Sequence, residues 1–234
     1  MSRVNYMRKI CFLLFVLMGL SLYGGDVSDF VNLGFSSNGN YFMFAQKNIN
    51  VAKVESYANA YIVDVAKNDY ASDGIFSYSE ATLPELGVDG YGLIFNIIKE
   101  NGWAIKKYGI NHNNSGKSIY FLANGAKPEN SLEFRIFDKH SVAKEISCIL
   151  NQSVNKADKK SSFYIDLNWT NAAGKSKKVV VGNPNIKRPN TGSYFIKNII
   201  SSPAGDALVF VIAKEVFNGS DLSVRYMVET VVLK

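Results

Sequence analysis

The chain has 234 residues, of which 47% are hydrophobic, 20% charged and 13% aromatic. This balance excludes an intrinsically disordered chain and suits one folded domain or two small ones. The formal net charge is +6 at pH 7, but residues 1–25 contribute three basic side chains and no acidic one. Without them the charge is +3 (6 minus 3). The basic character therefore gives little support for nucleic-acid binding.

Residues 1–25 have the pattern of a secretory signal peptide. A basic start precedes an apolar run at residues 10–22, and small residues suited to a cleavage site follow. The run has 13 residues, fewer than the ~20 that a membrane-spanning helix needs. The alternatives are an uncleaved anchor or a buried helix. Cys11 opens the run instead of following it, so we do not expect a lipid anchor. Met7 is an alternative start, and the mature chain is expected to begin between residues 22 and 26.

The first strand unit is organised around a polar turn. Residues 36–40 (SSNGN) lead into a strand at residues 41–45, and residues 60–65 (AYIVDV) form a second strand. The strand at 41–45 is apolar on both faces, since Met43 and Phe44 point to opposite sides. Such a strand is usually covered on both faces, so we expect a packed layer on either side of it.

The last unit repeats this order. Its turn, strand, loop and return strand lie at residues 202–206, 207–213, 218–221 and 224–232. Gly39 and Gly205 are 166 residues apart, and Tyr61 and Tyr226 are 165 apart. These nearly equal offsets indicate an internal repeat. A looser middle unit, residues 115–138, contains the same order of turn, strand, loop and strand.

One helix is expected between the first and middle units, within residues 83–108. Apolar side chains recur there at three- and four-residue steps, with a gap at Gly102. Thr82 and Glu85 resemble a capping box at its start, and Gly109 is a stop signal. Each glycine inside the segment weakens a helix by ~1 kcal/mol relative to alanine. Packing against a sheet must therefore hold this helix.

Residues 144–182 again have the pattern of strands. Apolar and polar side chains alternate along residues 163–169, which indicates a half-exposed strand, and a hairpin turn precedes another strand at 177–181. Cys148 alternates with apolar neighbours and is expected to be a small buried side chain. A reactive or intermolecular thiol is the alternative. The two-proline loop at 183–192 is the best internal boundary.

Two resemblances follow from these motifs. The segments GFSSNGNYFMFA and AYIVDV resemble the repeat of TolB-like propellers, in which a Ser-Pro-Asp-Gly turn opens a strand. Residues 36–39 lack the Pro and the Asp, and residues 202–205 keep the Pro but lack the Asp. Over residues 27–234 the chain is similar to a family of bacterial predicted secreted proteins, domain of unknown function 2259. That resemblance implies an exported protein with a helix among its strands, and implies no reaction and no site residues.

Motifs for catalysis and cofactor binding are mostly rejected. Residues 111–118 (NHNNSGKS) lack the first glycine of a phosphate-binding loop, and a strand instead of a helix follows. His112 and His140 lack metal-ligand spacing and are expected to be exposed. The acids within residues 64–73 do not fit an EF-hand, so we interpret them as solvated turn residues. We predict no catalytic residues, no cofactor and no metal site. Weak calcium binding and a triad of distant residues are the alternatives.

Surface candidates are basic turns and aromatic residues. The basic turns lie at residues 156–160, 175–178 and 187–188. We interpret them as solvated charge that protects strand edges, with a surface for anionic lipid or polymer as the alternative. Tyr70, Tyr164 and Trp169 are candidate interaction residues, with core packing as the equal alternative.

Together these patterns predict a mainly β (α+β) fold of twisted antiparallel sheets, sandwich or propeller-like, with one long helix inserted after the first β unit. Residues 26–234 are expected to form a single secreted domain after the signal peptide. We expect a periplasmic or secreted protein of the bacterial envelope, a non-catalytic binding or assembly module. Its expected partner is another envelope protein, with no nucleic acid and no membrane span after signal cleavage. The role rests on analogy with TolB-like repeats. A periplasmic hydrolase with a dispersed site and a passive structural envelope protein are the alternatives.

Overall fold

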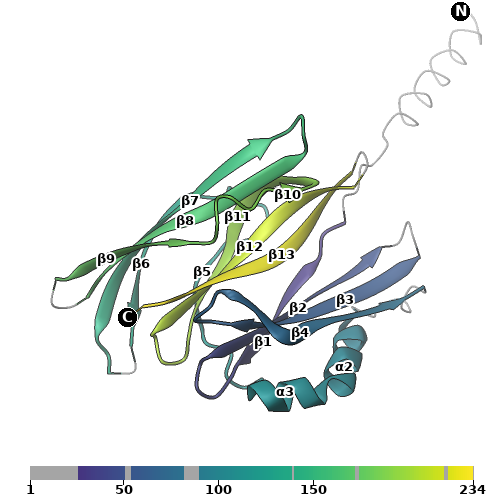
Figure 1. Cartoon of the computed structure of the whole chain (residues 1–234), viewed down its shortest axis with the longest axis horizontal. Coiled ribbons are helices and arrows are strands. Elements are labelled where there is room, and N and C mark those ends of the chain that lie inside the picture. The colour runs from purple at the N-terminus through teal and green to yellow at the C-terminus, as the bar shows by residue number, and fades with distance from the viewer. Residues whose placement is uncertain are drawn as a thin grey trace, which may run out of the picture.

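The computed structural model describes residues 26–50, 54–81, 90–138, 140–171, 174–218 and 221–233. Over these residues the protein consists of antiparallel strands in three open sheets, with two helices on one outer face (Figure 1). The layers follow one another in the order helices, first sheet, central sheet and third sheet. The expected signal peptide and the expected capping box at Thr82 and Glu85 lie outside the described residues.

Each sheet is named here by its strands. The first sheet has the order β1-β2-β3-β4, with β1 Asp29–Phe35, β2 Tyr41–Asn50, β3 Glu55–Asp64 and β4 Asp69–Glu80. The central sheet has the order β13-β12-β11-β5, with β13 Asp221–Val232, β12 Ala207–Asn218, β11 Thr191–Ser201 and β5 Lys117–Phe121. The third sheet has the order β10-β8-β7-β6, with β9 also paired to β8: β10 Arg188–Pro189, β8 Lys160–Asn171, β7 Ala143–Asn155, β6 Ser131–Phe137 and β9 Ser176–Val181. The helices are α2 Tyr91–Glu100 and α3 Gly102–Tyr108.

The strands at the centre of the stack are covered on both faces, as the sequence predicts for β2. Met43 packs into the core beneath the helices, and Phe44 packs into the core shared with the central sheet. In β12, Val209 faces the first sheet and Phe210 faces the third sheet. Full burial of one such side chain contributes roughly 1.5–3 kcal/mol. The continuous apolar runs in β2 and β12 therefore follow from their place between two cores.

The prediction of one long helix is wrong: within the described residues two short helices take its place. They meet at Asn101, whose φ of −112° leaves the helical region and whose backbone N–H and side-chain Nδ2 both donate to Ile97 O. Asn101 thus caps α2, and Gly102 opens α3. The predicted stop is confirmed, because Gly109 ends α3 with a φ of +63°.

The first and last units share the same turn. Gly39 N donates to Ser36 O, and Gly205 N donates to Ser202 O, each at 2.9 Å. In both turns the serine hydroxyl also accepts a backbone N–H from the first residue of the next strand. Each turn joins the first two strands of a three-strand meander, β1-β2-β3 or β11-β12-β13.

The middle unit does not repeat this arrangement. Its first strand, β5, pairs with β11 in the central sheet, and its second strand, β6, pairs with β7 in the third sheet. The sheets stack face to face as layers. A sandwich-like arrangement therefore fits the structure, and the propeller-like repeat is not supported.

Candidate functional site: a polar groove on the third sheet

Three neighbouring surface hollows lie on and beside the third sheet. A hollow of about 630 Å³ and one of about 510 Å³ lie on its outer face and share Glu133, Ser147 and Asn168. A further hollow of about 340 Å³ lies beside β6 and shares Arg135 with the second. We call the three neighbouring hollows, taken together, the polar groove. Its walls come from β6, β7, β8, β9, the loop before β5 and the turn before β12.

Strand register places four polar side chains in one row across the groove. Alternate residues such as Leu167 face the core, and their neighbours face outward. Glu133 on β6 lies opposite Ser147 on β7. Ser147 lies opposite Asn168 on β8, and Asn168 lies opposite Lys178 on β9. Neighbouring strands are ~4.8 Å apart, so the row is about 14 Å long. It offers hydrogen-bonding groups to an elongated ligand lying across the strands.

Asn168, inside this row, carries an acceptor that the protein does not satisfy. Its Oδ1 atom is buried and has no hydrogen-bond partner among the described residues. An unpaired buried acceptor costs roughly 1–3 kcal/mol, and a ligand that donates a hydrogen bond to it recovers that cost. At the two ends of the row, Glu133 and Lys178 are exposed, and neither forms an ion pair within the described part of the chain. The row therefore carries opposite charges at its ends.

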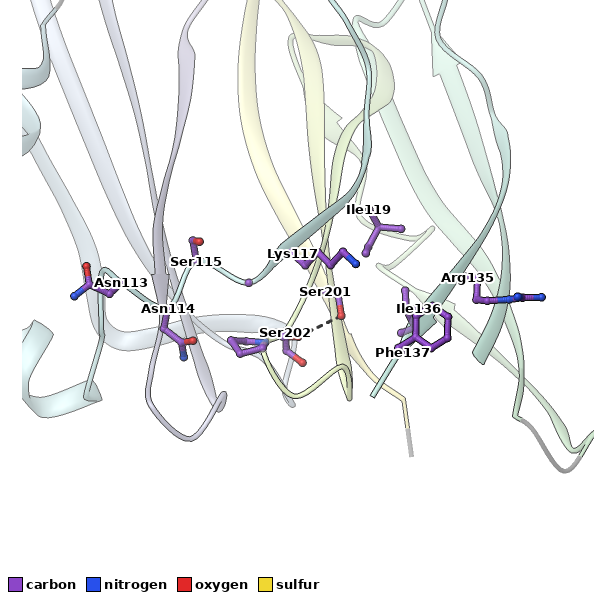
Figure 2. A pocket seen from close by; sticks show the side chains of 12 residues that line it. Asn113, Asn114, Ser115, Lys117, Ile119, Arg135, Ile136, Phe137, Ser201 and Ser202 are labelled. Atoms are coloured by element: carbon purple, nitrogen blue, oxygen red, sulfur yellow. Dashed lines mark hydrogen bonds between the residues drawn. The ribbon is translucent and has the colours of Figure 1, made fainter. Parts of the chain in front are cut away.

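The hollow beside β6 is positively charged. Figure 2 shows the loop at residues 113–115 on one side and Ile136 and Phe137 of β6 on the other. Lys117 and Arg135 are the charged side chains among the described residues that line it, and an exposed carboxylate on β7 pairs with Arg135. This end of the groove suits an anionic or hydrogen-bond-accepting group on a ligand.

The loop at residues 111–118 is a structural turn. Phe35 N donates to Asn114 O at 2.8 Å, and Asn111 N donates to Phe35 O at 2.9 Å, so the loop is bonded along β1. Gly116 has a φ of +71°, and a Cβ there would lie 2.4 Å from a backbone oxygen of β11. Strand β5 follows the loop, as the sequence predicts. The helix that a phosphate-binding loop needs is thus replaced by a strand.

The predicted exposure of both histidines is confirmed. His112 Nδ1 lies 2.7 Å from Leu33 O, and neither His112 nor His140 lines the polar groove. Within the described ranges, no group of three His, Cys, Asp or Glu side chains is placed to hold a metal ion. Of the turn acids, Asp73 forms an ion pair with Lys107 at 2.5 Å. Asp73 lies within β4 and Asp64 ends β3, so these acids are strand residues in ion pairs and not the solvated turn residues that the sequence predicts.

The three aromatic candidates lie in different environments. Trp169 is 5% exposed and belongs to the core between the third and central sheets. For this residue the core-packing alternative is therefore the correct one. Tyr164 is half-buried on the outer face of β8, beyond the lining of the groove. Tyr70 is on β4 of the first sheet, with its ring 5.4 Å from that of Tyr61. Partial burial, followed by the nearby Tyr61, raises the pKa of Tyr70 to about 12. The structure does not bring the three candidates together.

Cys148 is a buried core residue, as predicted. Burial raises the pKa of its thiol to about 11. A thiol is reactive as the thiolate, which this environment disfavours. Cys148 therefore acts as a small apolar side chain of β7.

Sequence reasoning missed the four-residue row. The alternation along residues 163–169 correctly predicted that Asn168 faces outward. It gave no sign of which residues on β6, β7 and β9 lie beside it. An alignment of the outward positions of successive hairpins could have indicated which side chains lie opposite one another.

The fold and the groove define a class: a layered antiparallel β protein with an open, hydrogen-bonding surface on one outer sheet. The family comparison then places the chain. The family model described as "Predicted secreted protein (DUF2259)" matches residues 44–232, and the chain belongs to this family. A comparison with curated proteins gave no match. Within the described residues, no helix is long and apolar enough to cross a membrane.

Proposed function

We propose that this secreted protein is a non-catalytic binding module of the bacterial envelope and that the polar groove is its binding surface. The observation that carries the proposal is the buried, unpartnered Oδ1 of Asn168 where the two outer hollows meet. Folded proteins leave few such atoms unpaired, and of the five among the described residues Asn168 Oδ1 is the one that belongs to the lining of the outer hollows. We assign a hydrogen-bond donor group of the ligand as the partner of Asn168 Oδ1.

The groove favours an elongated, polar ligand. Its central row offers a hydroxyl, an amide and two opposite charges, and the next row adds apolar contact from Ile149 and Val180, which are about half exposed. The positive end at Lys117 would hold an acidic group. A polar chain, either a peptide segment or a hydroxylated polymer, presents such groups at regular intervals.

The envelope location is part of the same proposal. The basic start and the apolar run of residues 10–22 support export, and the family consists of predicted secreted proteins. The ligand of an exported protein in this proposal would be an envelope component. A histidine-based hydrolase site gains no support from the groove, because neither histidine lines it.

Site-specific photo-crosslinking in living cells tests the proposal. A photoreactive residue at Ser147 lies within the row, and a matched one at Asp158 lies in the exposed β7–β8 turn outside it. We expect an adduct from position 147 that is absent from position 158 and weakened by Asn168→Val. Equal adducts from both positions, or none from position 147 in cells that export the protein, would overturn the proposal.

A further inference from the structure

The outer face of the helix layer carries large apolar side chains that the core does not use. The aromatic side chains of Phe95 on α2 and Trp103 on α3 are 67% and 54% exposed. Scattered single apolar residues are ordinary on protein surfaces, but two large aromatics on adjoining short helices form a concentrated feature.

The opposite sides of the same helices are firmly anchored. Leu93, Ile94 and Ile97 of α2 and Ala104 and Tyr108 of α3 are buried in the core over the first sheet. Because these residues fix both helices, the side chains on the far side are held in an outward position. Phe95 and Trp103 are thus displayed by a rigid support.

Each displayed aromatic has a lysine beside it. Lys99 follows Phe95 by four positions, and Lys106 follows Trp103 by three, so each pair shares one helix face. Both lysines are exposed, and within the described residues neither forms an ion pair. Residues 91–108 contain three lysines and one glutamate. Lys107 is paired with Asp73, so the face is aromatic and keeps a small net positive charge from Lys99 and Lys106.

This combination matches an anionic lipid surface. Aromatic rings settle at the level of the lipid headgroups, and lysines extend toward anionic headgroups while their stems cover apolar surface. Basic residues near such a surface are attracted within about one Debye length. The helix layer is also at the opposite end of the stack from the third sheet (Figure 1). A protein resting on its helices would leave the polar groove facing away from the membrane.

We propose that the outer face of α2 and α3 binds peripherally to anionic bilayers, with Phe95 and Trp103 entering the interface and Lys99 and Lys106 meeting the headgroups. This surface shares no residue with the polar groove, so the proposal stands independently of the function assigned to the groove.

The two tryptophans make the test direct. Trp103 is exposed, whereas Trp169 is buried and already shielded from water. When the mature protein is mixed with vesicles of phosphatidylglycerol and phosphatidylcholine in equal parts, we expect a blue shift in tryptophan emission and co-flotation. Trp103→Phe should abolish the shift. Pure phosphatidylcholine vesicles should bind far less, and added salt should release the protein from the anionic ones.

Charge reversal supplies the matched variants. Lys99→Glu with Lys106→Glu should weaken vesicle binding by on the order of tenfold or more. Lys156→Glu with Lys160→Glu changes the net charge equally at exposed positions of the β7–β8 turn and should have little effect. Circular dichroism checks that all variants fold. Failure of the wild type to float, or equal losses in both double variants, would overturn the proposal. An emission shift that depends on protein concentration without vesicles would instead assign the face to protein contact and would equally overturn it.

Discussion

The central and third sheets are both antiparallel, yet one contributes mainly to stability and the other provides an open surface. The central sheet is covered on both faces, so a strand such as β12 has an unbroken run of buried apolar residues. The third sheet is covered on one face only, and its outward positions, which are polar apart from side chains such as Ile149 and Val180, are hollowed into the groove. The difference teaches that stability is concentrated where a sheet has two neighbours, while a binding surface is available where it has one.

Truncation of a doubly covered strand should have the largest effect. Phe210→Ala removes a fully buried ring from β12 and should lower the free energy of unfolding by about 3–5 kcal/mol. Ile149→Ala, on the outer face of the third sheet, should cost less than ~1 kcal/mol because the side chain is 47% exposed. Urea unfolding of both variants measures the contrast. Similar losses would contradict the comparison between the sheets.

A second pair of variants tests how the central sheet meets the third. A Cβ at Gly205 would lie 2.2 Å from Phe137 O of β6, whereas a Cβ at Gly39 would have open space around it. Both glycines have positive φ, +67° and +74°. Gly205→Ala should destabilise by about 2–4 kcal/mol, and Gly39→Ala by about 1 kcal/mol from backbone strain alone. Thermal unfolding of the two variants measures whether the contact with β6 makes Gly205→Ala more destabilising than Gly39→Ala.

Glu229 gives the central sheet a pH dependence. It is buried on β13, beside Asn68 of the first sheet and Arg188 of the third sheet. Burial raises its pKa above the usual 4.5, although the Asn68 hydrogen bond and then the Arg188 charge oppose the rise. The unfolded chain therefore ionises first as pH increases. The stability from protonated Glu229 is fully present below pH 4.5 and is lost as pH rises through the higher folded-state pKa.

Glu229→Gln isolates this contribution, because glutamine still accepts from Asn68 and does not ionise. We expect the stability difference between variant and wild type to shift in favour of the variant between acidic and neutral pH, because only the wild type must ionise a buried carboxyl. Denaturant unfolding across that range measures it. A difference that stays constant with pH would contradict the raised pKa.

The smallest effect is expected in the groove. Asn168→Val removes an unsatisfied acceptor and adds a residue suited to strands, so it should leave stability unchanged or raise it by up to about 1 kcal/mol. As a control, Asn151→Val deletes an amide that donates to Asp166 at 2.8 Å and should give no gain. A clear loss of stability in Asn168→Val would mean that the amide serves the fold instead of a ligand.

Local sequence patterns predicted much of the fold. The apolar runs of β2 and β12 are where the sequence places them, and Gly109 ends a helix as expected. The return strands were found but are longer than predicted, since β3 begins at Glu55 instead of residue 60 and β13 at Asp221 instead of residue 224. Strands β1, β4 and β11 were not predicted. β4 and β11 are interrupted by register shifts, and polar or glycine positions break their alternation. The middle unit was misread because two strands adjacent in sequence join different sheets.

The sequence by itself determined the alternation of side chains and the glycine turns, because each depends on neighbours within a few residues. Only the tertiary structure decided that Asn101 divides the helix, that Trp169 is buried, and that Glu133, Ser147, Asn168 and Lys178 form one row. Those outcomes depend on strand register and layer stacking. Strand register and layer stacking are set by contacts between segments that are distant along the chain. Local sequence patterns do not show these contacts.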